Sequence, residues 1–126
     1  MGIEQLLDLA HQPECGRVDG VQVLAREFDL PIVCFGHAGN GNLHVNLMYD
    51  PADASQSQRA QAALARVFAL AISLGGTLSG EHGIGLAKRD FMPQAVDAPT
   101  LALMRQVKAV FDPDGILNPG KLLPPA

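Results

Sequence analysis

The placement of glycine constrains this chain more than any other feature of its sequence. The 126 residues include 13 glycines and 9 prolines, and the glycines gather in two stretches, 36–41 and 75–85. Glycines that cluster inside an otherwise apolar sequence indicate loops whose backbone bends sharply or approaches another group closely. The regular elements are therefore expected to be short and to connect these loops, within one domain or a piece of one.

Composition excludes several classes of protein. Apolar residues make up 48% of the chain and charged residues 17%, which is not the composition of a disordered chain. The net charge of −4 removes the usual electrostatic argument for binding nucleic acid, so we expect no nucleic-acid partner. Cys15 and Cys34 do not make a disulfide framework, and no leader or apolar run of about 18 residues is visible. We therefore expect reduced thiols and a cytoplasmic location.

Apolar periodicity predicts a small set of helices and strands. Helices are expected over 2–11, 18–29, 86–92 and 99–111, with Pro93 ending the third of these. A further helix is expected to begin at an N-cap, Asp53 or Ser55, and to end at Gly75. Strands are expected over 31–35 and 43–49. This order indicates an α+β fold with a small antiparallel sheet and packed helices. Two strands alone do not make a stable sheet, so either a strand has been missed or chain that is absent here completes it.

The first glycine-rich loop carries two histidines, His37 and His44, and lies between the two predicted strands. If these strands pair as neighbours, both imidazoles lie at the same end of the sheet. Imidazole suits Zn, Mn and Fe, and a site with open positions usually needs a third ligand such as a carboxylate. A tight loop with two surface histidines remains the alternative.

The second loop, 80–85, places Glu81 and His82 among three glycines. Glutamate offers a hard oxygen ligand, and histidine is the side chain best suited to proton transfer near neutral pH. Taken alone, this stretch also fits a flexible surface loop. The two loops together predict a His/His/Glu metal site with an adjacent histidine base. A third stretch, 112–121, indicates by itself only a turn that leads into an irregular segment.

Three stretches in series resemble one family. HAGNGNLHVN, GTLSGEHGIGLAKR and KAVFDPDGILNPGK are similar to motifs in the C-terminal domain of FAD-linked oxidoreductases of the vanillyl-alcohol-oxidase type. The D-2-hydroxyglutarate and D-lactate dehydrogenases and the glycolate oxidase flavin subunit belong to that family. The resemblance covers roughly residues 18–123 and implies this domain over 18–126, without the FAD-binding domain. It does not extend to residues 1–17, where the apolar spacing predicts an N-terminal helix and linker.

The resemblance implies oxidation of a small D-2-hydroxy acid to the 2-oxo acid, with hydride transfer to FAD. It assigns His37, His44 and Glu81 to a divalent metal, Zn or Mn, and Asn46 to the substrate. It assigns His82 as the base that takes the hydroxyl proton. The same resemblance places Asn118, and also Glu81, near the flavin ring.

The chain departs from the family pattern in two respects. Asn40 stands where relatives usually carry aspartate, and no residue here clearly replaces the basic groups that the absent part supplies; Lys88 and Arg89 are expected on a solvated helix face. An alternative function is a stand-alone metal-binding or assembly module that has lost the flavin domain. A metallohydrolase is less favoured because the chain has no His-Glu-x-x-His helix.

The apolar tail bears on the choice between these functions. A domain that completes its site on a partner exposes apolar surface when it is alone. We expect four residues of the tail to pack against the FAD-binding domain or subunit: Ile116, Leu117, Leu122 and Leu123. A homodimer formed through the same surface is the other candidate.

Overall fold

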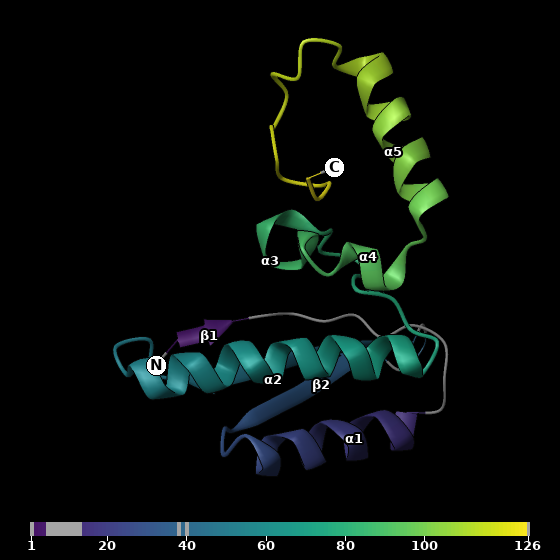
Figure 1. The fold of residues 1–126 in the computed structure, drawn as a ribbon. Helices are drawn as coiled ribbons and strands as arrows, with labels where there is room; N and C mark the ends of the chain where they lie inside the picture. The colour runs from purple at the N-terminus through teal and green to yellow at the C-terminus, as the bar shows by residue number, and fades with distance from the viewer. Residues whose placement is uncertain (1, 5–13, 38, 40, 126) are drawn as a thin grey trace. The chain divides into compact units, whose positions relative to one another are not determined.

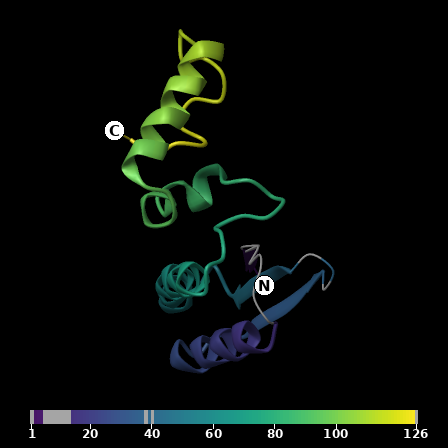
Figure 2. The same cartoon turned by 90° about the vertical axis from the view of Figure 1, so that its right-hand side faces the viewer.

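The computed structural model describes residues 2–4, 14–37, 39 and 41–125. They form two compact units, Met1–His82 and Gly83–Ala126. Each unit is described by itself below (Figures 1 and 2). Among the described residues, no helix is both long enough and apolar enough to cross a membrane.

The first unit is built on a three-stranded antiparallel sheet in the order β1-β3-β2. Strands β2 (Ile32–His37) and β3 (Asn42–Tyr49) form the hairpin that the sequence predicts. The third strand, β1 (Gly2–Glu4), pairs with β3 in a register that places Gly2 opposite Tyr49. The predicted helix over 2–11 is therefore wrong at residues 2–4, and its remainder lies outside the described residues. The strand that the sequence analysis missed is an edge strand of this sheet.

Two helices cover one face of this sheet. Helix α1 (Glu14–Glu27) and helix α2 (Ala54–Ser73) run side by side and contact β2 and β3 (Figure 2). Because side chains alternate between the two faces of a strand, Ile32, Val45 and Leu47 point toward the helices and are buried. The same core contains five residues of α2: Ala60, Ala63, Val67, Phe68 and Ala71.

Local signals set the ends of α2 as the sequence predicts. The Asp53 carboxylate accepts hydrogen bonds from the backbone N–H groups of Ser55 and Gln56, which identifies Asp53 as the N-cap. Gly75 follows the helix with a φ of +73°, a left-handed conformation that suits glycine. Helix α1 begins four residues before the predicted 18–29 segment and ends two residues before its end.

Cys34 belongs to the side of β2 that faces the helices and is a free thiol. Burial raises the pKa of this thiol above its usual value. A partly buried thiol with a raised pKa is a poor nucleophile, because the thiolate is the reactive form. The environment of Cys34 therefore does not favour reactivity of this thiol.

The second unit consists of three helices and an irregular tail. Helices α3 (Gly85–Arg89) and α4 (Met92–Ala95) precede the longer α5 (Ala98–Phe111), which is capped by Asp97. Pro93 lies in the first turn of α4, so the prediction that it ends a helix over 86–92 is wrong. The first turn tolerates proline because its backbone N–H groups have no partner within the helix.

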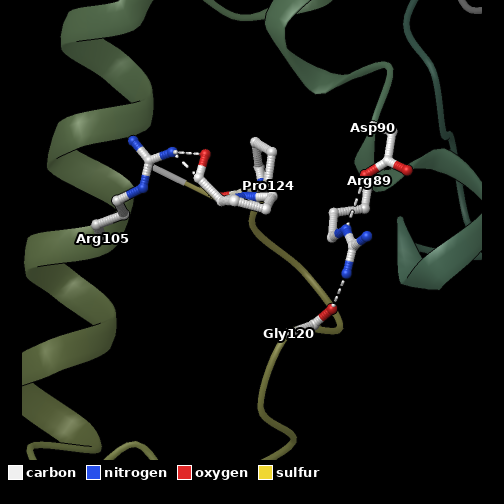
Figure 3. A network of polar contacts seen from close by, with 6 residues as sticks. Arg89, Asp90, Arg105, Gly120 and Pro124 are labelled. Carbon is white, nitrogen blue, oxygen red and sulfur yellow. Dashed lines mark hydrogen bonds and ion pairs between the residues drawn. The ribbon is translucent and has the colours of Figure 1, made fainter.

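Two arginines hold the tail of the second unit (Figure 3). Arg89 Nη1 donates to the carbonyl oxygen of Gly120 at 2.7 Å, and Arg89 Nε pairs with Asp90 at 2.9 Å. Arg105 Nη2 donates to the carbonyl oxygens of Pro124 and Pro125. The tail therefore has a defined path, although its described residues, up to Pro125, form no helix or strand.

Asp112 organises the turn after α5. Its carboxylate accepts hydrogen bonds from the Lys108 ammonium group and from the backbone N–H groups of Ile116 and Leu117. The Lys108 hydrogen bond is the main cause that lowers the pKa of Asp112 below its usual value, and the backbone donors add to it. The turn therefore depends on an ionised Asp112.

Candidate metal centre

The β2–β3 hairpin brings the two predicted histidine ligands to one face of the sheet. His37 ends β2 opposite Asn42, and His44 in β3 lies opposite Phe35. Directly opposed residues in an antiparallel pair point to the same face, as do residues two apart in one strand. His37 and His44 consequently share the face that α1 and α2 do not cover. Their rings lie edge to face, with centroids 5.3 Å apart.

The loop after α2 brings a carboxylate to this pair. Leu78 of this loop is buried, and Glu81 follows three residues later. Glu81 Oε1 lies 3.2 Å from His44 Nε2 and 3.5 Å from His82 Nε2. One carboxylate oxygen thus contacts two imidazoles.

The cluster of His37, His44 and Glu81 has the geometry and the chemistry of a cation site. One ligand atom from each of these residues lies within 4.8 Å of the other two. Ligand atoms about 2.1 Å from one tetrahedral Zn ion lie about 3.4 Å from each other, so small side-chain movements would bring all three into range. Two imidazoles and one carboxylate also suit Mn and Fe. The residues present therefore fit a divalent cation with open coordination positions.

The ligands differ in their access to solvent. His44 is only 4% exposed, whereas His37 and Glu81 are exposed. The His82 side chain is 48% exposed, so it remains accessible to a small molecule beside the cluster. One buried side chain and two exposed ones leave one side of the cluster open to solvent.

Asn46 lies on the same face, two residues after His44 in β3. Its Oδ1 atom is buried and has no hydrogen-bond partner among the described residues. A buried amide oxygen without a partner is unfavourable unless another group, such as a ligand or water, pairs with it. Asn46 therefore presents a buried amide oxygen on the same sheet face as His44.

The other residues singled out from the sequence belong to the second unit or lie outside the described residues. Asn118 belongs to the second unit, where it is exposed and has a φ of +45°. Lys88 is only 5% exposed, so the expected solvated position is wrong for it. Arg89 is likewise engaged, with the Gly120 carbonyl oxygen, rather than solvated. Asn40 lies outside the described residues.

Sequence reasoning missed one neighbour of the cluster, Phe35, whereas the asparagines of this stretch, Asn42 included, were candidates for polar contacts with the ligands. The Phe35 ring centroid lies 4.9 Å from that of His44. Asn42 is buried opposite His37. The strand register contained the signal for Phe35, because aligning the two strands around the loop between residues 37 and 42 places Phe35 opposite His44.

Comparison with known proteins gives a match over most of the chain. The sequence profile of the family described as "FAD linked oxidases, C-terminal domain" matches residues 16–122. The match includes all six site residues considered above: His37, His44, Asn46, Glu81, His82 and Asn118.

Several relatives share more than a third of the aligned residues. The glycolate oxidase subunit GlcD of Bacillus subtilis (strain 168) is 40% identical over 105 residues, which cover 83% of this chain and 22% of that protein. GlcD of Escherichia coli (strain K12) is 37% identical over 109 residues, which cover 86% of this chain and 22% of that protein. The D-2-hydroxyglutarate dehydrogenase of Stutzerimonas stutzeri (strain A1501) is 41% identical over 96 residues, which cover 75% of this chain and 21% of that protein. The chain thus spans about a fifth of the length of these curated relatives.

Proposed function

Because this chain belongs to the C-terminal domain family of the FAD-linked oxidases, we propose that it forms the metal- and substrate-binding part of an FAD-dependent 2-hydroxy-acid dehydrogenase. The substrate is a small D-2-hydroxy acid of the lactate, glycolate or 2-hydroxyglutarate type, and the product is the 2-oxo acid. The cluster of His37, His44 and Glu81 is the observation that carries this proposal.

We assign each polar residue of the cluster a role according to its position. His37, His44 and Glu81 hold a divalent cation, Zn or Mn, because their ligand atoms already converge. Asn46 pairs its buried amide oxygen with the substrate, which removes the cost of leaving that atom without a partner. Glu81 and Asn118 are proposed to lie near the flavin ring in the complete protein.

His82 is the proposed base. Its imidazole is half exposed and lies beside the Glu81 carboxylate, which orients the ring and stabilises the imidazolium that proton uptake would produce. A divalent cation in the cluster would supply Lewis acidity that lowers the pKa of a hydroxyl group, and FAD would supply a hydride acceptor. In this arrangement the 2-hydroxy acid would lose its hydroxyl proton to His82, and FAD held by the flavin-binding part would supply the acceptor for the C2 hydride that it also loses. These two losses convert it to the 2-oxo acid.

The second unit carries the proposed docking surface for the flavin-binding part. The apolar stripe of α5 is exposed at Leu103, Val107, Val110 and Phe111, and the stripe continues past the helix end at Ile116 and Leu117. Two other apolar residues of α5 are less accessible: Leu101 is buried and Met104 is half-buried. Contiguous exposed apolar residues of this extent mark an interaction surface. Because the curated relatives are several times longer than this chain, the flavin-bearing part is the proposed occupant.

Flavin absorption measurements on the native polypeptide that carries this sequence test the proposal. We expect the purified polypeptide to show a flavin absorption spectrum, and D-lactate, glycolate or D-2-hydroxyglutarate to bleach it under anaerobic conditions. His82→Gln should retain the flavin and the metal but lose the bleaching. A native polypeptide without flavin, neither bleached by these acids nor associated with a flavoprotein, would overturn the proposal and favour a stand-alone metal-binding module.

A further inference from the structure

His44 is buried although it lies on the open face of the sheet. It is 4% exposed, whereas Val33 and Phe35 on the same face are 49% and 52% exposed. Three rings surround its imidazole: those of Phe35, His37 and His82, with centroids 4.9, 5.3 and 5.7 Å away. Phe35 is the nearest of these rings, and it has no ligand atom and no titratable proton.

The imidazole orientation depends on such neighbours. The χ2 torsion of histidine has broad, weakly preferred minima, so the side chain's own preferences do not fix the ring. Phe35 is paired directly with His44 across the strands, and the two rings are inclined by 42°. Tilted aromatic pairs at this separation are favourable beyond their buried area. The Glu81 carboxylate contacts Nε2 of the same ring.

We propose that Phe35 is a positioning residue that holds the His44 imidazole in the orientation in which its nitrogen converges with the ligand atoms of His37 and Glu81. The role in metal binding rests on the proposed function, whereas the orientation itself exists without a cation. Phe35 neither binds the cation nor exchanges protons. It acts through His44, and its half-exposed ring is retained on an open sheet face for that reason.

Three substitutions in the 126-residue chain separate this role from general packing. Phe35→Leu removes the ring and keeps an apolar side chain, and Phe35→Tyr keeps the ring. Val33→Ala is the matched control, because Val33 lies two residues earlier on the same face with similar exposure and has no ring. Zn²⁺ affinity is measured by competition with a chromophoric chelator. Co²⁺ spectra report the coordination geometry, and NOEs in the metal-free chain report the ring contacts between His44 and His37.

We expect Phe35→Leu to lower Zn²⁺ affinity about twofold to tenfold, because this fold-change corresponds to the free energy that an aromatic pair contributes. The same substitution should change the Co²⁺ spectrum. The NOEs between His44 and His37 should weaken in this variant. Phe35→Tyr should restore all three properties, and Val33→Ala should leave them unchanged. Equal affinity, spectra and NOEs in Phe35→Leu and the parent would overturn the proposal, as would an equal loss in Val33→Ala.

The NOE measurement distinguishes this inference from the proposed metal site. If the parent binds no Zn²⁺, the metal assignment fails, and the NOEs still decide whether Phe35 orients His44. If Phe35→Leu loses its folded amide spectrum, Phe35→Met is the second variant and is held to the same criteria. Retained His44 NOEs in a folded Phe35→Met chain would then overturn the proposal.

Discussion

His44 Nε2 lies 3.2 Å from Glu81 Oε1, although the two residues stand on opposite sides of a 20-residue helix in the sequence. His44 is held in the middle of the sheet, and Glu81 arrives from the loop that follows α2. This contact joins two glycine-rich stretches into one site. It is also the contact that a divalent cation would replace with two coordination bonds.

The first prediction concerns the ligands themselves. His44→Ala and Glu81→Gln should each lower Zn²⁺ affinity at least about a hundredfold, because losing a direct ligand costs more than losing an outer partner. Isothermal titration calorimetry of the metal-free chain measures this effect. His11→Ala is the control, since that histidine belongs to neither glycine-rich loop. Unchanged Zn²⁺ binding in both ligand variants would show that the ion binds elsewhere.

The second prediction concerns the close approach of β2 and β3. A β-carbon added at Gly36 would overlap the backbone carbonyl oxygen of Asn42 and lie 3.1 Å from the Cα atom of Leu43. Gly36→Ala should therefore destabilise the hairpin by about 1–3 kcal/mol and weaken metal binding, because the strands must separate. Gly39→Ala is the matched control, since a β-carbon there meets nothing within 4 Å. Urea unfolding followed by circular dichroism compares the two; equal stability would contradict the packing argument.

The third prediction contrasts a buried and an exposed phenylalanine. Phe68 is completely buried in α2, and Phe111 is 78% exposed at the end of α5. Phe68→Ala should cost about 3–5 kcal/mol of unfolding free energy, the usual range for a fully buried ring. Phe111→Ala should change stability by less than about 0.5 kcal/mol. Chemical denaturation measures both values.

Phe111 also tests the docking surface. In the native polypeptide, Phe111→Asp should impair packing against the flavin-bearing part and lower flavin content or thermal stability. Lys121→Gln is the control, because Lys121 is exposed in the tail and this substitution changes the net charge by the same −1. An unchanged flavin content and melting temperature in Phe111→Asp would remove α5 from the proposed interface.

The fourth prediction concerns pH. The hydrogen bond from Lys108, and then those from the backbone N–H groups of Leu117 and Ile116, lower the pKa of Asp112 in the folded chain. A lowered folded-state pKa contributes stability that is present above the unfolded value of about 3.9 and is lost as pH falls through the folded value. Asp112→Asn should therefore lower the melting temperature at pH 7 and make less difference at strongly acid pH.

Melting curves of the parent and of Asp112→Asn across the acid range measure this pH dependence. Asp114→Asn is the control, because Asp114 lies in the same turn and is exposed. A difference between Asp112→Asn and the parent that is constant from pH 7 into strong acid would show that ionisation of Asp112 is not the cause.

Sequence patterns predicted the elements whose signals are local. The apolar period of α2, its Asp53 cap and the glycine after it lie within one stretch of chain, so near neighbours alone determine them. The alternation of β3 identified it for the same reason. The prediction at Pro93 was wrong because proline is tolerated in the first turn of a helix as well as after the end of one.

The residues of the candidate metal site were identified from the sequence, and their convergence was decided by the tertiary structure. Two histidines and a glutamate in glycine-rich loops predicted a metal site, but the 3.2 Å contact of His44 with Glu81 requires α2 to pack on the sheet and return the chain. A strand as short as β1 has too few residues for a period-two pattern, so only its pairing with β3 reveals it. Phe35 likewise gained a role only through strand register. Residue spacing predicts the structure of segments that are local in sequence. These contacts join residues that are distant in sequence, so they depend on tertiary packing that no local pattern predicts.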